Sequence, residues 1–434
     1  MNIFVGVLVG LVVLMILVIL HEFGHFIAAR KNGVNVLEFG IGFPPRAIAW
    51  IKDSKTGKWR RFPKKEWPKD KATKVVYSNG DKTFAQKGMV FSINWLPIGG
   101  FCQMDGESAA DERKGTFGAA SFWEKTKILF AGVTMNWLTA IVIFTILAWV
   151  GMPDFLDDQF MVSEDMRMDW APVKVTEVEE DSPANSAGIK VGDYILSIDG
   201  AGMKYASEIS DYNSKHAGET VTITVMRNVD ANCIKQSSCD KETCECSKDA
   251  ETIETDVTLN PRGSDYYLGV KMESSQIKYY STWSAPIVGI GLTAQITGQT
   301  FKGVGEMLWN LIRGVGSLFS FDSQVRQDGQ EAISAVGDSV SGPVGIIGVL
   351  FPAFTSAGPA NLAFLAAIIS ISLACMNVLP IPALDGGRWL LIAIYKLRRK
   401  KLTKETEEKI VSRAFIVLLI LMLAVTILDI VRFF

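Results

Sequence analysis

Four long apolar runs constrain the fold of this chain more than any other feature. They cover residues 1–20, 128–150, 362–379 and 414–430. About 20 apolar residues in a helix, rising 1.5 Å each, cross a hydrocarbon core roughly 30 Å thick. The first run lacks the basic segment and cleavage site of a signal peptide, and its helical pattern continues to Arg30. The sequence therefore predicts a polytopic α-helical membrane protein with four transmembrane helices. Their expected regions are 1–30, 127–151, 341–387 and 412–432.

The charges of the connecting segments orient these helices. Residues 30–127 carry 19 Lys and Arg against 10 Asp and Glu, and residues 388–413 are also basic. Residues 154–278 carry 25 acidic side chains against 12 basic ones. Because loops rich in Lys and Arg stay in the cytoplasm, we expect both chain ends outside and a cytoplasmic or membrane-associated region at 31–126. No basic tract or aromatic-rich basic face indicates a nucleic-acid partner.

A metal-binding motif closes the first apolar run, where His21-Glu22-Phe23-Gly24-His25 reads HExxH. Residues four apart share a helix face, so both imidazoles can reach one zinc ion. Glu22 would then lie beside the metal, where it can take a proton from water. A chance match is the alternative, but ionisable groups in a membrane span are costly and usually functional. We therefore expect one catalytic Zn²⁺.

A catalytic zinc usually has three protein ligands, and the third is not a nearby histidine. His216, the one remaining histidine, lies in the acidic outer region, across the membrane from the motif. A metzincin would have its third histidine at position 31, which is Lys31 here. A thermolysin-type glutamate would follow the second histidine by about twenty residues, but Glu38 is too near His25 and Glu66 is rather far from it. The third ligand must therefore be a carboxylate or thiolate elsewhere in the chain.

Asp385 is the best candidate for that ligand. It follows Pro380 and Pro382, which cannot continue a helix, and it precedes two glycines. The first and third runs both cross from outside to inside, so His21, His25 and Asp385 reach the same leaflet. The alternative is an ordinary helix end with a solvated aspartate.

Several motifs together resemble the site-2 protease family of intramembrane zinc metalloproteases, in its bacterial RseP-type branch. They are HEFGH at 21–25, FGIGF at 39–43, PIGGF at 97–101, FAGVTMNW at 130–137, SGPVG at 341–345 and NVLPIPALDGG at 377–387. They follow the family order along nearly the whole chain. The resemblance implies an enzyme of the bacterial cytoplasmic (inner) membrane. It would cut transmembrane segments of substrates such as membrane-bound anti-sigma factors or remnant signal peptides.

The resemblance also assigns roles to individual residues. It implies that His21, His25 and Asp385 bind zinc and that Glu22 is the catalytic base. Asn377 would hold the substrate backbone or the oxyanion. Residues 89–104 would form a membrane-associated β-hairpin loop whose edge meets an unwound substrate. The substrate-binding set is Asn377, Pro380, Pro382, Gly99 and Gly100.

The outer region contains a β-rich module at 171–262 that looks like an inserted bacterial PDZ domain. Residues 173–178 alternate like a strand, and residues 220–226 are a second β-rich run. Such domains bind an extended peptide, here a substrate tail, by adding a strand to an open sheet edge. The alternative is a module that only blocks access. Its insertion contains Cys233, Cys239, Cys244 and Cys246, for which an oxidising compartment favours disulfides over a small metal site.

Two further segments lie between the expected helices. Residues 279–322 are apolar but contain Gly, Gln, Lys and Arg, which is typical of amphipathic helices at the surface of the lipid bilayer. Residues 52–86 form a polar, basic insertion that is either a surface excursion or a docking patch.

Two other functions are compatible with the HExxH motif. One is a membrane metalloprotease of another class, with a downstream glutamate ligand. The other is a metal-bearing scaffold or transporter gated by the PDZ-like module. Asp385→Ala distinguishes the first, because the zinc content should fall only if Asp385 is a ligand. Glu22→Gln distinguishes the second, because it should keep zinc but abolish cleavage, whereas a scaffold would cleave nothing in either form.

Overall fold

The computed structural model describes residues 3–52, 58–64, 89–108, 113–156, 158–169, 172–228, 250–273, 277–318, 322, 324–331 and 342–433. The chain divides into two compact units, Met1–Phe144 with Gly289–Phe434, and Thr145–Val288. The four cysteines of the outer insertion, and most of the 52–86 insertion, lie outside the described residues.

Among the described residues, four helices are long and apolar enough to cross a membrane, in agreement with the four apolar runs of the sequence. They are α1 (Ile3–Lys31), α2 (Phe122–Val150), α10 (Pro359–Val378) and α12 (Lys404–Phe433). Helix α10 ends where Leu379 turns to extended backbone, one residue before Pro380. The proline break therefore lies where the sequence predicts it. A shorter helix, α11 (Asp385–Leu397), follows the break.

Helix α1 packs closely against a short helical segment that precedes α10. This segment consists of α8 (Pro343–Gly345), the π-helical turn η2 (Ile346–Leu350) and α9 (Phe351–Ser356). A Cβ atom added at Gly6 would lie 2.4 Å from Pro352 Cα, and one at Gly10 would lie 2.6 Å from the Phe351 ring. The two glycines therefore let the helices approach more closely than larger residues would allow.

A small sheet follows α1 and contains β1 (Val36–Lys52), β2 (Trp59–Arg61) and β3 (Val90–Met104), in the order β2-β1-β3. Both halves of β3 pair with β1, so that Gly40 has Phe101 on one side and Ser92 on the other. The two halves of the β-hairpin loop expected at 89–104 therefore pair with β1 instead of with each other. Gly40 permits this, since a Cβ there would lie 2.4 Å from the Phe101 ring.

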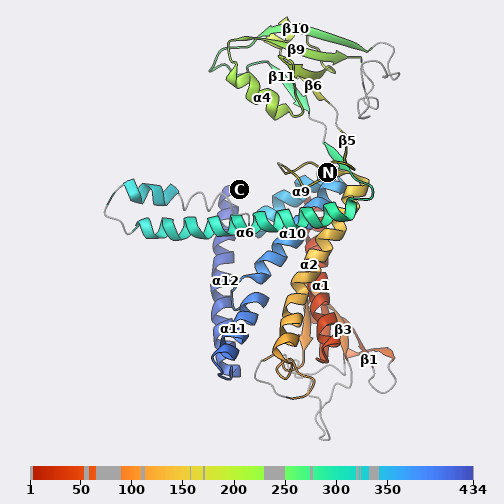
Figure 1. The fold of residues 1–434 in the computed structure, drawn as a ribbon, viewed down its shortest axis with the longest axis vertical. Coiled ribbons are helices and arrows are strands. Elements are labelled where there is room, and N and C mark those ends of the chain that lie inside the picture. Colours follow the sequence, from red (N-terminus) through yellow and green to blue (C-terminus); the bar gives the residue numbers. More distant parts are fainter. Residues whose placement is uncertain are drawn as a thin grey trace. The chain divides into compact units, whose positions relative to one another are not determined.

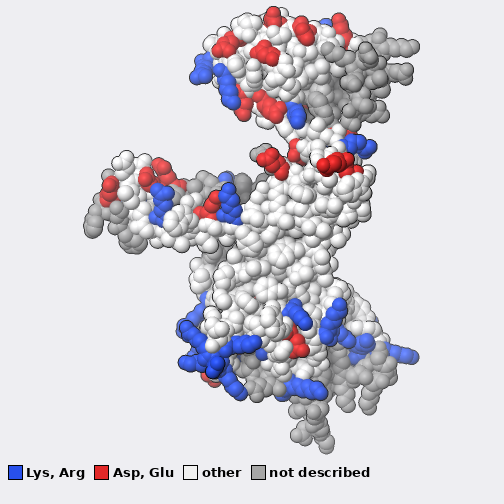
Figure 2. Space-filling view, viewed as in Figure 1, with Lys and Arg blue, Asp and Glu red and all other residues white. Residues whose placement is uncertain are grey.

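One end of the helical unit contains β1 and α11 together (Figure 1). Lys and Arg side chains gather at this end, and the face in view carries an uncharged band next to it (Figure 2). Helix α6 (Ala285–Leu318) has exposed apolar side chains, including Trp309 and Ile312, and exposed charged ones, including Lys302 and Glu306. The segment expected to be amphipathic thus forms one long helix.

The second unit is built around a six-stranded sheet with the strand order β10-β9-β7-β6-β11, in which β8 also pairs with β7. The strands are β6 (Val173–Val178), β7 (Tyr194–Ile198), β8 (Ala201–Gly202), β9 (Thr220–Arg227), β10 (Glu251–Thr258) and β11 (Val270–Glu273). Two helices accompany them, α3 (Pro183–Ser186) and α4 (Ala206–Lys215). The sheet continues past the predicted module boundary at residue 262, because β11 pairs with β6.

A second, smaller sheet in this unit joins β4 (Met152–Pro153), β12 (Lys278–Tyr280) and β5 (Arg167–Asp169). It brings together the two segments of chain that flank the six-stranded module.

Candidate metal centre

Two histidines on one face of α1 and an aspartate from α11 bring three metal-binding atoms together. His21 Nε2 lies 3.2 Å from His25 Nε2, and each lies 3.2 Å from Asp385 Oδ2. The two histidines are 7% and 6% exposed, so bulk water does not compete for their ring nitrogens. Among the described residues, this is the cluster of His, Cys, Asp and Glu with the spacing of a metal site.

The break after α10 places Asp385 at the first position of α11. Gly386 and Gly387 make this possible, because Cβ atoms there would lie 2.1 Å from the Val378 carbonyl oxygen and 2.0 Å from the Ile381 carbonyl. The chain can therefore fold back tightly on itself after the prolines. A carboxylate at a helix N-terminus also interacts favourably with the helix dipole.

The spacing of the three atoms suits zinc. Tetrahedral zinc has Zn–N and Zn–O distances of about 2.0–2.2 Å, which separates any two ligand atoms by about 3.3–3.6 Å. The observed spacing of 3.2 Å is close to that value. Two imidazole nitrogens and one carboxylate oxygen are also the ligand types that zinc prefers, so the residues fit this metal.

The far nitrogens of both rings are engaged. His25 Nδ1 lies 2.8 Å from the carbonyl oxygen of Ile128, and His21 Nδ1 lies 3.2 Å from the side-chain amide of Asn136. Both partners belong to α2. Metal-ligating histidines commonly bind such outer partners through the nitrogen that does not face the metal, and these bonds set the ring orientation.

Glu22 is held at the edge of the small sheet. Its Oε2 accepts a hydrogen bond of 3.0 Å from the backbone N–H of Cys102 on β3. Gly100 is buried beside it, and a Cβ at Gly100 would lie 3.9 Å from Glu22 Cγ. The candidate base therefore contacts strand β3 while it lies next to the histidines of its own helix.

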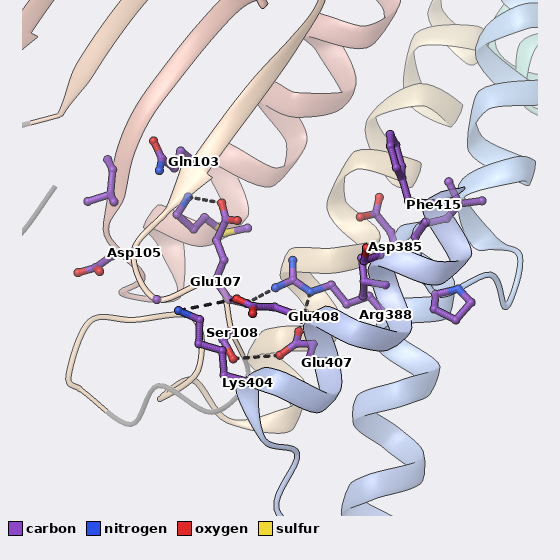
Figure 3. A pocket seen from close by; sticks show the side chains of 18 of the residues that line it. Gln103, Asp105, Glu107, Ser108, Asp385, Arg388, Lys404, Glu407, Glu408 and Phe415 are labelled. Carbon is purple, nitrogen blue, oxygen red and sulfur yellow. Dashed lines mark hydrogen bonds and ion pairs between the residues drawn. The ribbon is translucent and has the colours of Figure 1, made fainter. Parts of the chain in front are cut away.

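A cavity of about 1260 Å³ opens beside Asp385 (Figure 3). Polar bonds in its lining join the segment after β3, helix α11 and helix α12. Arg388 Nε lies 3.3 Å from Glu407, Ser108 donates to Glu407 at 3.1 Å, and Arg388 also donates to the Glu107 carbonyl. The cavity beside Asp385 is therefore lined by polar and charged groups from three separate segments.

Other predicted residues lie elsewhere. The Asn377 amide donates to the Leu373 carbonyl one turn back in α10. Pro382 lines the cavity, whereas Pro380 is exposed. Gly99 adopts a φ of +75° next to the Phe43 ring, a conformation that favours glycine. His216 is in the other unit, where its Nδ1 lies 2.8 Å from Glu219 Oε2.

Sequence reasoning missed three partners of the site, namely Asn136, the Ile128 carbonyl and the Cys102 amide. The two backbone groups carry no sequence signal. Asn136 did have one, because an uncharged polar residue within an otherwise apolar span requires a buried hydrogen-bond partner.

Comparisons with known proteins find similarity to zinc metalloproteases. The model of peptidase family M50 matches residues 9–62 and 80–422. A Clostridium acetobutylicum protein described as a zinc metalloprotease is 27% identical, over 99% of this chain and 98% of its own. The regulator of sigma-W protease RasP of Bacillus subtilis is 26% identical, over 96% of each chain. The zinc metalloprotease RasP of Shouchella clausii is 25% identical, over 96% of this chain and 97% of its own.

Proposed function

This chain belongs to peptidase family M50, the site-2 protease family, and is a zinc metalloprotease; from that premise we propose that it cuts the transmembrane segments of other membrane proteins. The observation that carries the proposal is the approach of His21, His25 and Asp385 to 3.2 Å at the end of two highly apolar helices. A soluble substrate would not need a metal centre built into such helices.

We assign these three residues as the zinc ligands and Glu22 as the general base. When bound, zinc supplies Lewis-acid polarisation of the scissile carbonyl and lowers the pKa of water to about 7. Glu22 takes the proton that the attacking water loses and passes it to the leaving amine. Its hydrogen bond from Cys102 keeps the carboxylate aimed at the site. Asn377 can stabilise the oxyanion if its amide turns away from Leu373.

The substrate must unwind before it is cut, because a hydrogen-bonded helix conceals its carbonyl groups. The final part of β3 pairs with β1 on one side, and on its other side the Cys102 N–H reaches Glu22. An unwound segment can add to this edge as a further strand, which presents its backbone to the catalytic base. Gly99 and Gly100 keep the edge free of side chains. Pro380 and Pro382 would border the bound segment from the other side.

The proposed location is a bacterial cytoplasmic membrane, with the metal centre near the cytoplasmic face. Support comes from the Lys and Arg side chains that gather at the β1 and α11 end of the helical unit (Figure 2). The six-stranded module would then lie outside and bind substrate tails as a PDZ domain. Its four insertion cysteines would form disulfides there, and α6 would lie on the outer surface of the bilayer.

Membrane-tethered anti-sigma factors and remnant signal peptides are the proposed substrates. The Bacillus relative is named as a regulator of a sigma factor, which supports the first class.

Two substitutions test the function. Purified Glu22→Gln should retain zinc but cleave a tagged transmembrane peptide at least about 100-fold more slowly, because proton transfer loses its base. Asp385→Ala should lose zinc as well as activity.

His216→Ala is the matched control, since that exposed histidine lies in the other unit, and it should keep both zinc and activity. Full zinc content in Asp385→Ala would indicate a different ligand. Cleavage at the normal rate by Glu22→Gln would exclude the proposed base.

A further inference from the structure

Asn136 lies in the middle of α2 with no exposed surface. Its side-chain amide is 3.2 Å from His21 Nδ1, although 115 residues separate the two in sequence. The other atom of the amide, placed as Oδ1, has no hydrogen-bond partner in the described part of the chain. A buried amide atom without a hydrogen-bond partner destabilises the folded chain, so the presence of Asn136 at this position needs an explanation.

The chemistry of the two histidines supplies that reason. A ring that gives its Nε2 lone pair to a metal must carry its proton on Nδ1. His25 meets this condition, because its Nδ1 faces the Ile128 carbonyl, which can only accept a hydrogen bond. His21 needs an acceptor in the same way, and the Asn136 amide is the group in contact with its Nδ1.

The oxygen and nitrogen of an amide occupy nearly the same space and are distinguished by their partners. Either orientation of the Asn136 amide leaves one of its atoms without a partner, so the bond to His21 decides between them. With Oδ1 toward His21, the amide accepts the Nδ1 proton and leaves Nε2 free for the metal. With Nδ2 toward His21, the proton would be on Nε2, where it would block metal binding.

The backbone of Asn136 is also held in place. Its carbonyl oxygen accepts a hydrogen bond of 2.9 Å from Ser370 on α10, the helix that leads to the break before Asp385. Asn136 thus connects α2 to α1 through its side chain and to α10 through its backbone. Of these two contacts, only the side-chain contact reaches a proposed zinc ligand, so a substitution of Ser370 leaves the amide beside His21.

We propose that Asn136 is a positioning residue, which accepts the Nδ1 proton of His21 and thereby holds that imidazole in the form that binds zinc. The proposal rests on the assignment of His21 as a zinc ligand. It predicts that the affinity for zinc depends on the side chain at this position. An acceptor of similar size should preserve that affinity.

The test compares the zinc dissociation constants of the purified full-length variants, measured by competition with a chelator. Asn136→Leu should bind zinc about 10–100-fold more weakly, the usual cost of losing such an outer partner. Asn136→Asp should bind at least as tightly as the wild type, because a carboxylate oxygen is a stronger acceptor. Ser370→Ala is the control; it removes the bond to the Asn136 backbone but leaves the amide, and it should keep wild-type affinity.

Nitrogen-15 spectra of the histidines provide a second measurement on the unmodified protein. The chain has three histidines, so the signals of His21, His25 and His216 can be separated by single substitutions. In the zinc-loaded protein, His21 should carry its proton on Nδ1.

The results separate failure of this inference from failure of the proposed function. Wild-type zinc affinity in Asn136→Leu, or equal losses in Asn136→Leu and Ser370→Ala, would overturn the positioning role. A proton on Nε2 of zinc-loaded His21 would instead overturn the assignment of His21 as a zinc ligand through that nitrogen. If zinc binding also survived Asp385→Ala, the ligand assignment itself would fail.

Discussion

Gly132 shows how one residue can determine whether the metal centre forms. It lies one helical turn before Asn136 on α2, directly against the two imidazoles. A Cβ at this position would be 2.5 Å from His25 Nε2 and 2.6 Å from His21 Nε2, closer than carbon and nitrogen atoms can approach. The backbone of α2 therefore forms one wall of the site, which only glycine permits.

Gly132→Ala should weaken zinc binding by at least about 10-fold, because the added methyl group must displace the ligand nitrogens from their 3.2 Å spacing. Chelator competition on the purified protein measures this change. Gly303→Ala is the control, since an added Cβ there meets no atom within 4 Å in the described structure. Unchanged affinity in Gly132→Ala would mean that α2 is farther from the metal than the structure indicates.

Among the helices, α12 makes little contact along its length but is anchored near both ends. Side chains from Phe415 to Leu423 are largely exposed, as expected for a surface that faces lipid. Near its end, Asp429 accepts hydrogen bonds from the backbone of Gly342 and Gly345. Near its start, buried Glu407 pairs with Arg388 of α11, three residues after Asp385. The ion pair thus connects α12 to the helix that supplies a ligand (Figure 3).

Arg388→Met should lower the free energy of unfolding of the full-length protein by about 3 kcal/mol, because it removes the cation from a buried carboxylate. Denaturation in detergent, followed by circular dichroism, measures the loss. The double variant Arg388→Met with Glu407→Met should recover most of it, since an apolar pair avoids the burial of an uncompensated charge. If the double variant were less stable than Arg388→Met, the ion pair would not be the source of the effect.

At the scale of the whole molecule, polar bonds join the two segments of chain that flank the six-stranded module of the second unit. Asp165 accepts hydrogen bonds from the backbone and hydroxyl groups of Thr282 and Ser284, just before α6. Desolvation raises the pKa of Asp165, but these bonds outweigh it and hold the pKa well below its usual range.

This shift predicts a dependence on pH. The folded chain binds the Asp165 proton more weakly than the unfolded chain, so the stabilisation is complete above the ordinary pKa of about 4 and is lost as the pH falls below it. Amide exchange at Thr282 and Ser284 should therefore accelerate below about pH 4, after correction for the intrinsic rate. In Asp165→Asn this pH dependence should disappear. Asp199→Asn, in the same unit, should leave it unchanged.

Much of the fold followed from local sequence alone. Runs of about 20 apolar residues predict spanning helices wherever they occur, and prolines end a helix without help from distant residues. The pattern HExxH likewise places two imidazoles on one helix face. Asp385 could be proposed as a zinc ligand from two local features. The loop charges predict which side of the membrane it reaches, and the prolines predict the helix break before it. These features are set by short segments, so no tertiary contact was needed to expect them.

Other features depend on contacts between distant segments. Only the tertiary structure decided that both halves of β3 pair with β1, because strand pairing depends on which edges meet. It also decided the partners of the metal centre, since backbone groups such as the Cys102 N–H have no signature in sequence. The 3.2 Å spacing of His21 and Asp385 was likewise decided by packing, through glycines that let α1, α2 and the start of α11 approach closely. The sequence by itself determined which atoms were available, and packing determined their distances.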